Sequence, residues 1–243
     1  MKFLLIFILS FLSNLFLNAQ NLDGAWQLIE YNGEEVTNRE VIKVVQDHYF
    51  ALGSRDLQTN AFLGAAGGEF VLKDNQLIEN RDFDTYNASK IGEKRSYSIK
   101  WIGNKKIELS SPDEHKIWQK ISIKTQDLDG NWVITGRQRN GEMKTMTPGD
   151  RRTIKILGGG RFQWVAFNSS TKQFYASGGG TYSAENGVYQ ENISFFSKDS
   201  DRVGAQLKFE YDIKNDQWHH SGQSTTGKPI YEIWSRYQEV YKK

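Results

Sequence analysis

One short signature, Leu-Asp-Gly-x-Trp, occurs twice in this chain of 243 residues. It reads LDGAWQL at residues 22–28 and LDGNWVI at residues 128–134. Self-similarity at a long period is the sequence sign of a duplicated folding unit. The repeat therefore constrains the architecture more than any other feature of the sequence.

The segments that follow the two signatures also align with each other. At a shift of 112 residues, GEFVLKDNQLIENRDF at 68–83 falls on GTYSAENGVYQENISF at 180–195 without a gap. The same shift matches Phe50 with Phe162 and Phe62 with Phe174, and KIWQK at 116–120 corresponds to EIWSR at 232–236. We therefore expect two related domains, residues 20–124 and 125–243, without a long linker between them.

The beginning of the chain has the pattern of a signal peptide, predicted here as residues 1–19. A single Lys2 precedes an apolar run, and small and polar residues end near Ala19. The alternative is an uncleaved anchor, but Ser10, Ser13 and Asn14 shorten the apolar span below what a bilayer requires. We expect an exported chain, periplasmic or extracellular, without a membrane span after cleavage.

Composition excludes several kinds of site. The chain has no cysteine, which removes disulfides, thiolate metal ligands and cysteine nucleophiles together. Its formal charge of +2 gives no reason to expect nucleic acid or an anionic membrane as a partner. An exported chain without disulfides needs a sufficient core, and its many aromatic residues supply the apolar area.

The hydrophobic pattern predicts β-strands. Residues 206–213 (QLKFEYDI) alternate between apolar and polar, and residues 188–196 (VYQENISFF) place Tyr189, Glu191, Ile193 and Phe195 on one face. Such alternation indicates antiparallel sheet with one buried face. We count about eight strands per unit, and only NREVIKVVQDHY at 38–49 has a weak helical pattern. The predicted fold class is all-β, with each unit closed into a barrel because closure removes exposed edges.

At this point a resemblance to a known family can be stated. Gly24-Ala25-Trp26 and Gly130-Asn131-Trp132 resemble the Gly-x-Trp opening of lipocalins and other calycins. The whole pattern is similar to lipocalin-like domains of unknown function in exported bacterial proteins. The resemblance implies that each Trp packs across the closed end of an antiparallel barrel, beneath a cation of the last strand, Lys120 or Arg236. The units depart from the family in being short, nearer to avidin-sized barrels, and in lacking disulfides.

The second unit is the better candidate for a ligand cavity because it has the fuller aromatic complement. The alternative is a solid core without a cavity, and the first unit is expected to be the more structural one. Apolar lining with a few polar groups is typical of small-ligand sites. The candidate ligand-binding residues are Phe162, Trp164, Phe174, Tyr182, Tyr189, Glu191, Phe195, Phe209, Tyr211 and Arg236.

Two carboxylates, Glu79 and Glu191, occupy matching positions on the apolar faces of their strands. Burying an unpaired carboxylate is costly. One interpretation is a structural salt bridge to Lys120 or Arg236 of the last strands, or a position at a wet strand end. The others are a polar hook inside a ligand cavity and a general acid.

The chain shows no catalytic motif, and no metal site or cofactor is predicted. The neighbours His219 and His220 point to opposite faces of a strand and so cannot easily share one ion. We expect a non-enzymatic binding protein that holds a small hydrophobic molecule in the second barrel. The alternative is a structural or protein-interaction module of the cell envelope, with solid barrels and an envelope protein as its partner.

Overall fold

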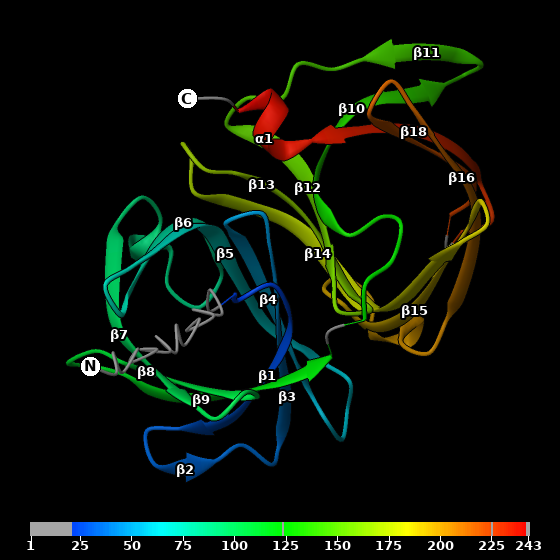
Figure 1. The fold of residues 1–243 in the computed structure, drawn as a ribbon. Coiled ribbons are helices and arrows are strands. Elements are labelled where there is room, and N and C mark those ends of the chain that lie inside the picture. Colours follow the sequence, from blue (N-terminus) through cyan, green and yellow to red (C-terminus); the bar gives the residue numbers. More distant parts are fainter. Residues whose placement is uncertain (1–20, 123, 225, 242–243) are drawn as a thin grey trace, which may run out of the picture.

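The structure is a computed structural model that describes residues 21–122, 124–224 and 226–241, so the predicted signal peptide lies outside the described residues. It contains two closed antiparallel barrels of eight strands each, side by side (Figure 1), which confirms the predicted fold class. In both, the first and last strands pair and close the sheet, through β1–β9 and β10–β18. Both barrels are lipocalin-like in this up-and-down order.

Barrel 1 is formed by β1 (Gly24–Tyr31), β3 (Arg39–Gln46), β4 (Tyr49–Asp56), β5 (Phe62–Lys73), β6 (Gln76–Asp84), β7 (Lys94–Ile102), β8 (Lys106–Ser110) and β9 (His115–Ser122). Barrel 2 is formed by β10 (Gly130–Arg139), β12 (Arg151–Gly158), β13 (Arg161–Asn168), β14 (Gln173–Glu185), β15 (Val188–Phe196), β16 (Gln206–Lys214), β17 (Gln217–Gln223) and β18 (Pro229–Arg236). The remaining elements are β2 (Glu34–Glu35), β11 (Glu142–Thr145), two 3₁₀ turns, η1 (Ala88–Lys90) and η2 (Ser200–Arg202), and the short helix α1 (Tyr237–Val240). Within the described ranges, no helix is both long enough and apolar enough to cross a membrane.

The weak helical pattern at 38–49 was misleading, because most of this stretch is strand β3. Val41 and Val45 face the interior of barrel 1, whereas Val44 packs into a cluster shared with barrel 2. Since β3 is covered on both faces, it is apolar on both faces and loses the alternation of a half-exposed strand. Burial on two sides therefore explains why this strand has a weak helical pattern.

A shared apolar cluster joins the two barrels along their outer walls. It combines Val44, Tyr49 and Phe83 of barrel 1 with Ile156 and Phe167 of barrel 2, among others. Phe83 and Phe167 lie with ring centroids 5.0 Å apart. The layer between the barrels is thus a third hydrophobic core, in addition to the cores inside the two barrels.

A buried ion pair and the C-terminal segment add polar contacts to this interface. Arg152 Nη2 lies 2.8 Å from Asp82 Oδ2, and the hydroxyl of Tyr49 donates to the same carboxylate at 2.9 Å. Tyr237 of α1 donates to Glu69 Oε1 at 3.3 Å, and Gln238 donates to the carbonyl oxygen of Asp47 at 2.9 Å. Helix α1 therefore helps to hold barrel 2 against barrel 1.

The interface has an approximate two-fold axis, since residues at matching places in the repeat meet each other. Phe62 stacks on Phe174 with ring centroids 5.9 Å apart and planes at 4°. At the other end of the strands, a Cβ at Gly158 would lie 2.9 Å from Oε1 of its counterpart Gln46. Because matched pairs meet near both ends, the axis runs along the strands, and the two barrels open toward the same side of the molecule.

Candidate functional site

One end of each barrel is sealed by the tryptophan of its signature. Trp132 is fully buried, and its indole Nε1 donates to the Leu128 carbonyl oxygen at 2.9 Å. Arg236 Cζ lies 3.8 Å from a Trp132 ring centroid, and Arg236 Nη1 donates to the Asp129 carbonyl oxygen at 2.8 Å. The indole and its cation thus form the plug that the resemblance implied.

Barrel 1 repeats this plug with a weaker cation. Trp26 donates to the Leu22 carbonyl oxygen at 2.7 Å, and Lys120 Nζ lies 4.7 Å from a Trp26 ring centroid. An ammonium has no planar face to stack on an indole, which suits its longer distance. At each closed end, a cation of the last strand therefore lies over the tryptophan of the first strand of the same barrel.

A buried ion pair crosses the middle of each barrel. Lys155 Nζ lies 2.7 Å from Glu191 Oε1 in barrel 2, and Lys43 Nζ lies 2.9 Å from Glu79 Oε1 in barrel 1. The hydroxyl of Tyr189 also donates to Glu191 at 2.7 Å. The salt-bridge interpretation of the two carboxylates holds, but its proposed partners Lys120 and Arg236 were wrong, since these cations lie over the plugs.

In barrel 1 the ion pair fixes the charge of the carboxylate. Burial alone would raise the pKa of Glu79, but the ammonium of Lys43 and the guanidinium of Arg81 outweigh it and lower the pKa to about 2. Arg81 Nη2 lies 3.2 Å from Glu79 Oε2. A carboxylate held ionised in this way is a poor general acid, because it has no proton to donate near neutral pH.

The opposite end of barrel 2 is an open pocket of about 570 Å³. Apolar side chains form the walls of the pocket, and polar side chains form its floor. The apolar lining consists of Trp164, Ala166, Phe196, Leu207, Phe209, Pro229, Ile230 and Trp234. The polar and charged lining consists of Arg137, Gln138, Arg151, Thr153, Lys155, Glu191, His220, Ser224, Lys228 and Glu232. Small-ligand sites combine apolar walls with placed polar groups, as this pocket does, although its polar and charged lining residues outnumber its apolar ones.

The floor of this pocket contains a buried histidine, His220, which is 1% exposed. Its Nδ1 lies 3.5 Å from Glu232 Oε2, too far for a well-formed hydrogen bond, and neither ring nitrogen has a partner within the described residues. Burial lowers the pKa of His220, an effect that Lys155 reinforces and Glu232 opposes. The imidazole is therefore neutral at pH 7 and offers one donor and one acceptor.

Glu232 beside it is fully committed to other groups. Arg137 Nη2 lies 2.5 Å from Glu232 Oε1, and Trp234 Nε1 donates to Glu232 Oε2 at 3.1 Å. Burial would raise the pKa of Glu232, but His220 and Arg137 lower it to about 2. The pocket floor thus combines an ionised, satisfied carboxylate with an unsatisfied neutral imidazole.

The structure brings only some of the predicted site residues into this pocket. Trp164, Glu191 and Phe209 line it, whereas Phe162, Tyr182 and Tyr189 lie deeper, in the closed core of barrel 2. Tyr211 packs against that core and donates to Asp127 Oδ2 at 2.7 Å. Arg236 belongs to the plug at the other end.

Phe174 and Phe195 lie on the outer wall of barrel 2, so their placement in the interior was wrong. A β-bulge in β15 pairs Ile193 with Gly180 but Phe195 with Gly179, which leaves Ser194 as an extra residue. One extra residue reverses every side chain beyond it. Phe195 therefore points to barrel 1, and Phe196 faces the pocket instead, with its ring centroid 5.6 Å from that of Trp164.

Most of the residues that line the pocket were not predicted from the sequence, among them Lys155, Phe196, Leu207, His220, Ile230, Glu232 and Trp234. One of them carried a usable signal. Lys155 matches Lys43 at the same shift that matches Glu191 with Glu79, and a charge repeated on an apolar strand indicates a buried partner. His220 and Glu232 replace Leu109 and Lys116 of barrel 1, so the repeat gave no guide to them.

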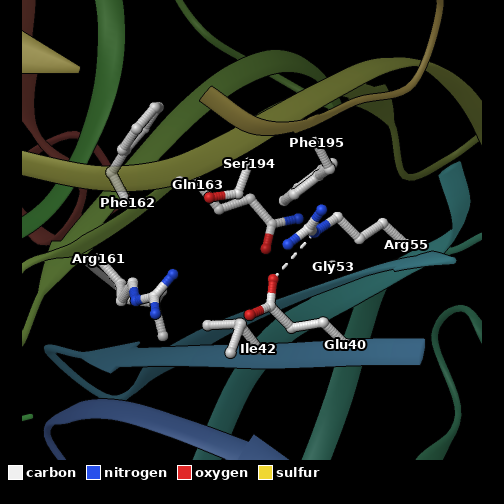
Figure 2. Close-up of a pocket in the computed structure, with 11 residues that line it drawn as sticks. Glu40, Ile42, Gly53, Arg55, Arg161, Phe162, Gln163, Ser194 and Phe195 are labelled. Atoms are coloured by element: carbon white, nitrogen blue, oxygen red, sulfur yellow. Dashed lines mark hydrogen bonds and ion pairs between the residues drawn. The ribbon is translucent and has the colours of Figure 1, made fainter. Parts of the chain in front are cut away.

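The crevice of Figure 2, which lies between the two barrels, is too small to be a ligand cavity. Figure 2 shows Glu40 and Arg55 of barrel 1 facing Arg161, Gln163 and Phe195 of barrel 2, with Arg55 Nε 3.1 Å from Glu40 Oε2. Its volume is about 10 Å³, room for about one water molecule. Within the parts of the chain that the structure describes, no group of three or more histidine and carboxylate side chains is placed to hold a metal ion.

Comparison with known proteins finds a family model and solved structures that are similar to parts of the chain. Residues 127–243 match the family model of a domain of unknown function (DUF4488). The chain is similar to an uncharacterized protein from Bacteroides eggerthii, at 18% identity and a TM-score of 0.32, over 41% of this chain and 99% of that one. It is also similar to a lipocalin-like protein from Bacteroides uniformis, at 20% identity and a TM-score of 0.33, over 41% and 98%. No curated protein matches the sequence.

Proposed function

We propose that the chain is an exported binding protein and that the mouth of barrel 2 holds a small, mainly apolar molecule. The observation that carries the proposal is the open pocket of about 570 Å³ with aromatic walls. This volume falls within the usual range of small-molecule sites. Export rests on the sequence of the first nineteen residues.

The polar floor narrows the kind of molecule. His220 is neutral and has no partner among the described residues, so a buried polar group there costs about 1–3 kcal/mol until something satisfies it. A ligand with one uncharged polar group, such as a hydroxyl or a carbonyl, would supply the missing hydrogen bond. Trp164 and Phe196 would then cover its apolar part.

The first experiment is native mass spectrometry of the mature protein purified from its own host, followed by solvent extraction. A stoichiometric apolar adduct supports a carrier and gives its ligand class. A clean unliganded mass, together with no binding of uncharged probes, would favour the alternative of an envelope interaction module with an envelope protein as partner.

A fluorescence titration locates the site. N-phenyl-1-naphthylamine is uncharged and fluoresces in apolar surroundings, so it should bind with one equivalent in barrel 2. Trp164→Ala removes a wall of the pocket and should weaken binding at least about tenfold, the loss expected for an aromatic contact. The matched control is Leu52→Ala, since Leu52 holds the same place in barrel 1. An equal effect of both variants would reject barrel 2 as the site.

A further inference from the structure

Barrel 1 has an open mouth of its own, about 520 Å³ in volume, on the same side of the molecule as that of barrel 2. Many of its lining residues stand at strand positions that match those of barrel 2, and each mouth has four lining cations, but this one has one lining carboxylate where the mouth of barrel 2 has two. Its apolar lining consists of Leu28, Val41, Leu52, Leu63, Ala66 and Trp118. Four cations, Arg39, Arg81, Lys90 and Lys116, line it together with one carboxylate, Glu114.

The single carboxylate of the lining is already shared among several groups. Glu114 lies 2.5 Å from Lys116 Nζ, 3.3 Å from Arg95 Nη2 and 3.5 Å from Lys90 Nζ. The hydroxyl of Tyr97 donates to it at 3.0 Å. One negative charge among three cations leaves a positive excess at the mouth.

Two of the cations have donor groups that no acceptor among the described residues uses fully. Arg39 bonds the Asn38 side-chain oxygen at 3.4 Å and makes no ion pair with a carboxylate in the described parts of the chain. Arg81 is 6% exposed, and its Nη atoms bond Glu79, Asp84 and Tyr97, yet its Nε has no acceptor within the described residues. A buried guanidinium N–H without a partner is an unmet donor inside a cationic pocket.

We infer that the mouth of barrel 1 is a second binding site, for a small organic anion with one carboxylate and a compact apolar body. Arg39 and Lys90 at the rim receive the carboxylate together with the Nε of Arg81. Leu52, Val41 and Trp118 contact the apolar body. The mouth of barrel 2 has two lining carboxylates, Glu191 and Glu232, among its four cations, and so a smaller positive excess than the mouth of barrel 1.

Charge discrimination on the full mature chain tests the inference. Octanoate and octanamide share chain length and shape and differ in charge. Isothermal titration calorimetry should give one equivalent of octanoate and a dissociation constant for octanamide at least about tenfold weaker, since charge-assisted hydrogen bonds to arginine are the stronger ones. Methyl resonances of Leu28 and Leu52 should shift on binding, and those of Leu207 and Ile230 should not.

A pair of matched variants separates the two mouths. Arg39→Gln should weaken octanoate binding by up to about fivefold, as loss of one partly exposed ion pair does. Arg151→Gln, at the same place in barrel 2, should leave it unchanged. Equal affinity for octanoate and octanamide, shifts confined to Leu207 and Ile230, or equal effects of the two variants would each overturn the inference. None of these results depends on whether the naphthylamine probe binds barrel 2.

Discussion

Phe62 and Phe174 stack on each other across the interface, although they stand 112 residues apart at equivalent positions of the repeat. Phe195 stacks on Phe62 as well, with ring centroids 5.9 Å apart. The outer walls of the two barrels are therefore packed like an interior, and changes there should affect the stability of the whole chain.

Gly53→Ala tests how tightly this interface is packed. A Cβ at Gly53 would lie 2.4 Å from Cζ of Phe195, so the ring must move. We expect the free energy of unfolding to fall by about 1–3 kcal/mol, as overpacking does. In a Phe195→Ala background the added methyl group no longer meets the ring that supplies its three nearest contacts, so its cost should shrink in a double-mutant cycle of urea denaturation. An equal cost in both backgrounds would argue against the contact.

Glu191→Gln tests the buried ion pair of barrel 2. Without the carboxylate, the Lys155 ammonium remains buried and unpaired, which should cost about 3–5 kcal/mol of unfolding free energy. The double variant Lys155→Met with Glu191→Leu should recover most of that loss, because no charge is then buried. Chemical denaturation of the three proteins measures both effects. A loss below about 1 kcal/mol for Glu191→Gln would show that the pair is not a structural element.

Much of the fold was predictable from the sequence. The signature repeat indicates two related units, and the alternation within a strand depends only on residues that are close together in the sequence. Tyr189, Glu191 and Ile193 of β15 face inward as their alternation indicates. Phe195 does not, because the bulge at Ser194 reverses it, and no residue type in VYQENISFF announces that bulge. Only the pairing of β15 with Gly179 and Gly180 of β14 reveals the extra residue.

The pocket was harder to predict for a related reason. Phe174 and Phe195 are as apolar as any core residue. Where a strand is buried on both faces, the sequence pattern does not distinguish the residues that face the barrel interior from those on its outer wall. The polar floor joins His220 of β17 to Glu232 of β18, in a barrel whose partner repeat has Leu109 and Lys116 there. Alignment of the two repeats shows what the barrels share, so it could not indicate the residues that distinguish their mouths.

The depressed pKa of His220 predicts a stability change with pH. An unfolded histidine titrates near pH 6.5, and burial lowers the folded pKa below that value. Between the two values the unfolded chain binds a proton that the folded chain does not. The unfolding free energy should therefore be highest above pH 6.5 and fall by up to about 1.4 kcal/mol for each pH unit below it.

His220→Leu isolates this effect, since leucine stands at the matching place in barrel 1. The carboxylate of Glu232, with a folded pKa of about 2, contributes only below its ordinary range, well outside the window from pH 7 to pH 5.5. Urea denaturation at pH 7 and at pH 5.5 measures how much unfolding free energy is lost between these two values. This loss should be smaller in the variant than in the wild-type protein by about 1 kcal/mol or more. Identical pH dependence of the two proteins would place the titrating group elsewhere.

Trp132→Ala tests the plug at the closed end of barrel 2. The variant removes a fully buried indole, the acceptor face for Arg236 and the hydrogen bond to Leu128, so it should cost about 3 kcal/mol or more. Arg236→Lys keeps the charge but loses the planar guanidinium, as in barrel 1, and should cost less, about 0.5–2 kcal/mol. Differential scanning calorimetry gives both values from the shift in melting temperature. Because the barrels share a core, Trp26→Ala should lower the same transition by a comparable amount, and a melting midpoint unchanged by Trp132→Ala would mean that the indole does not close the barrel.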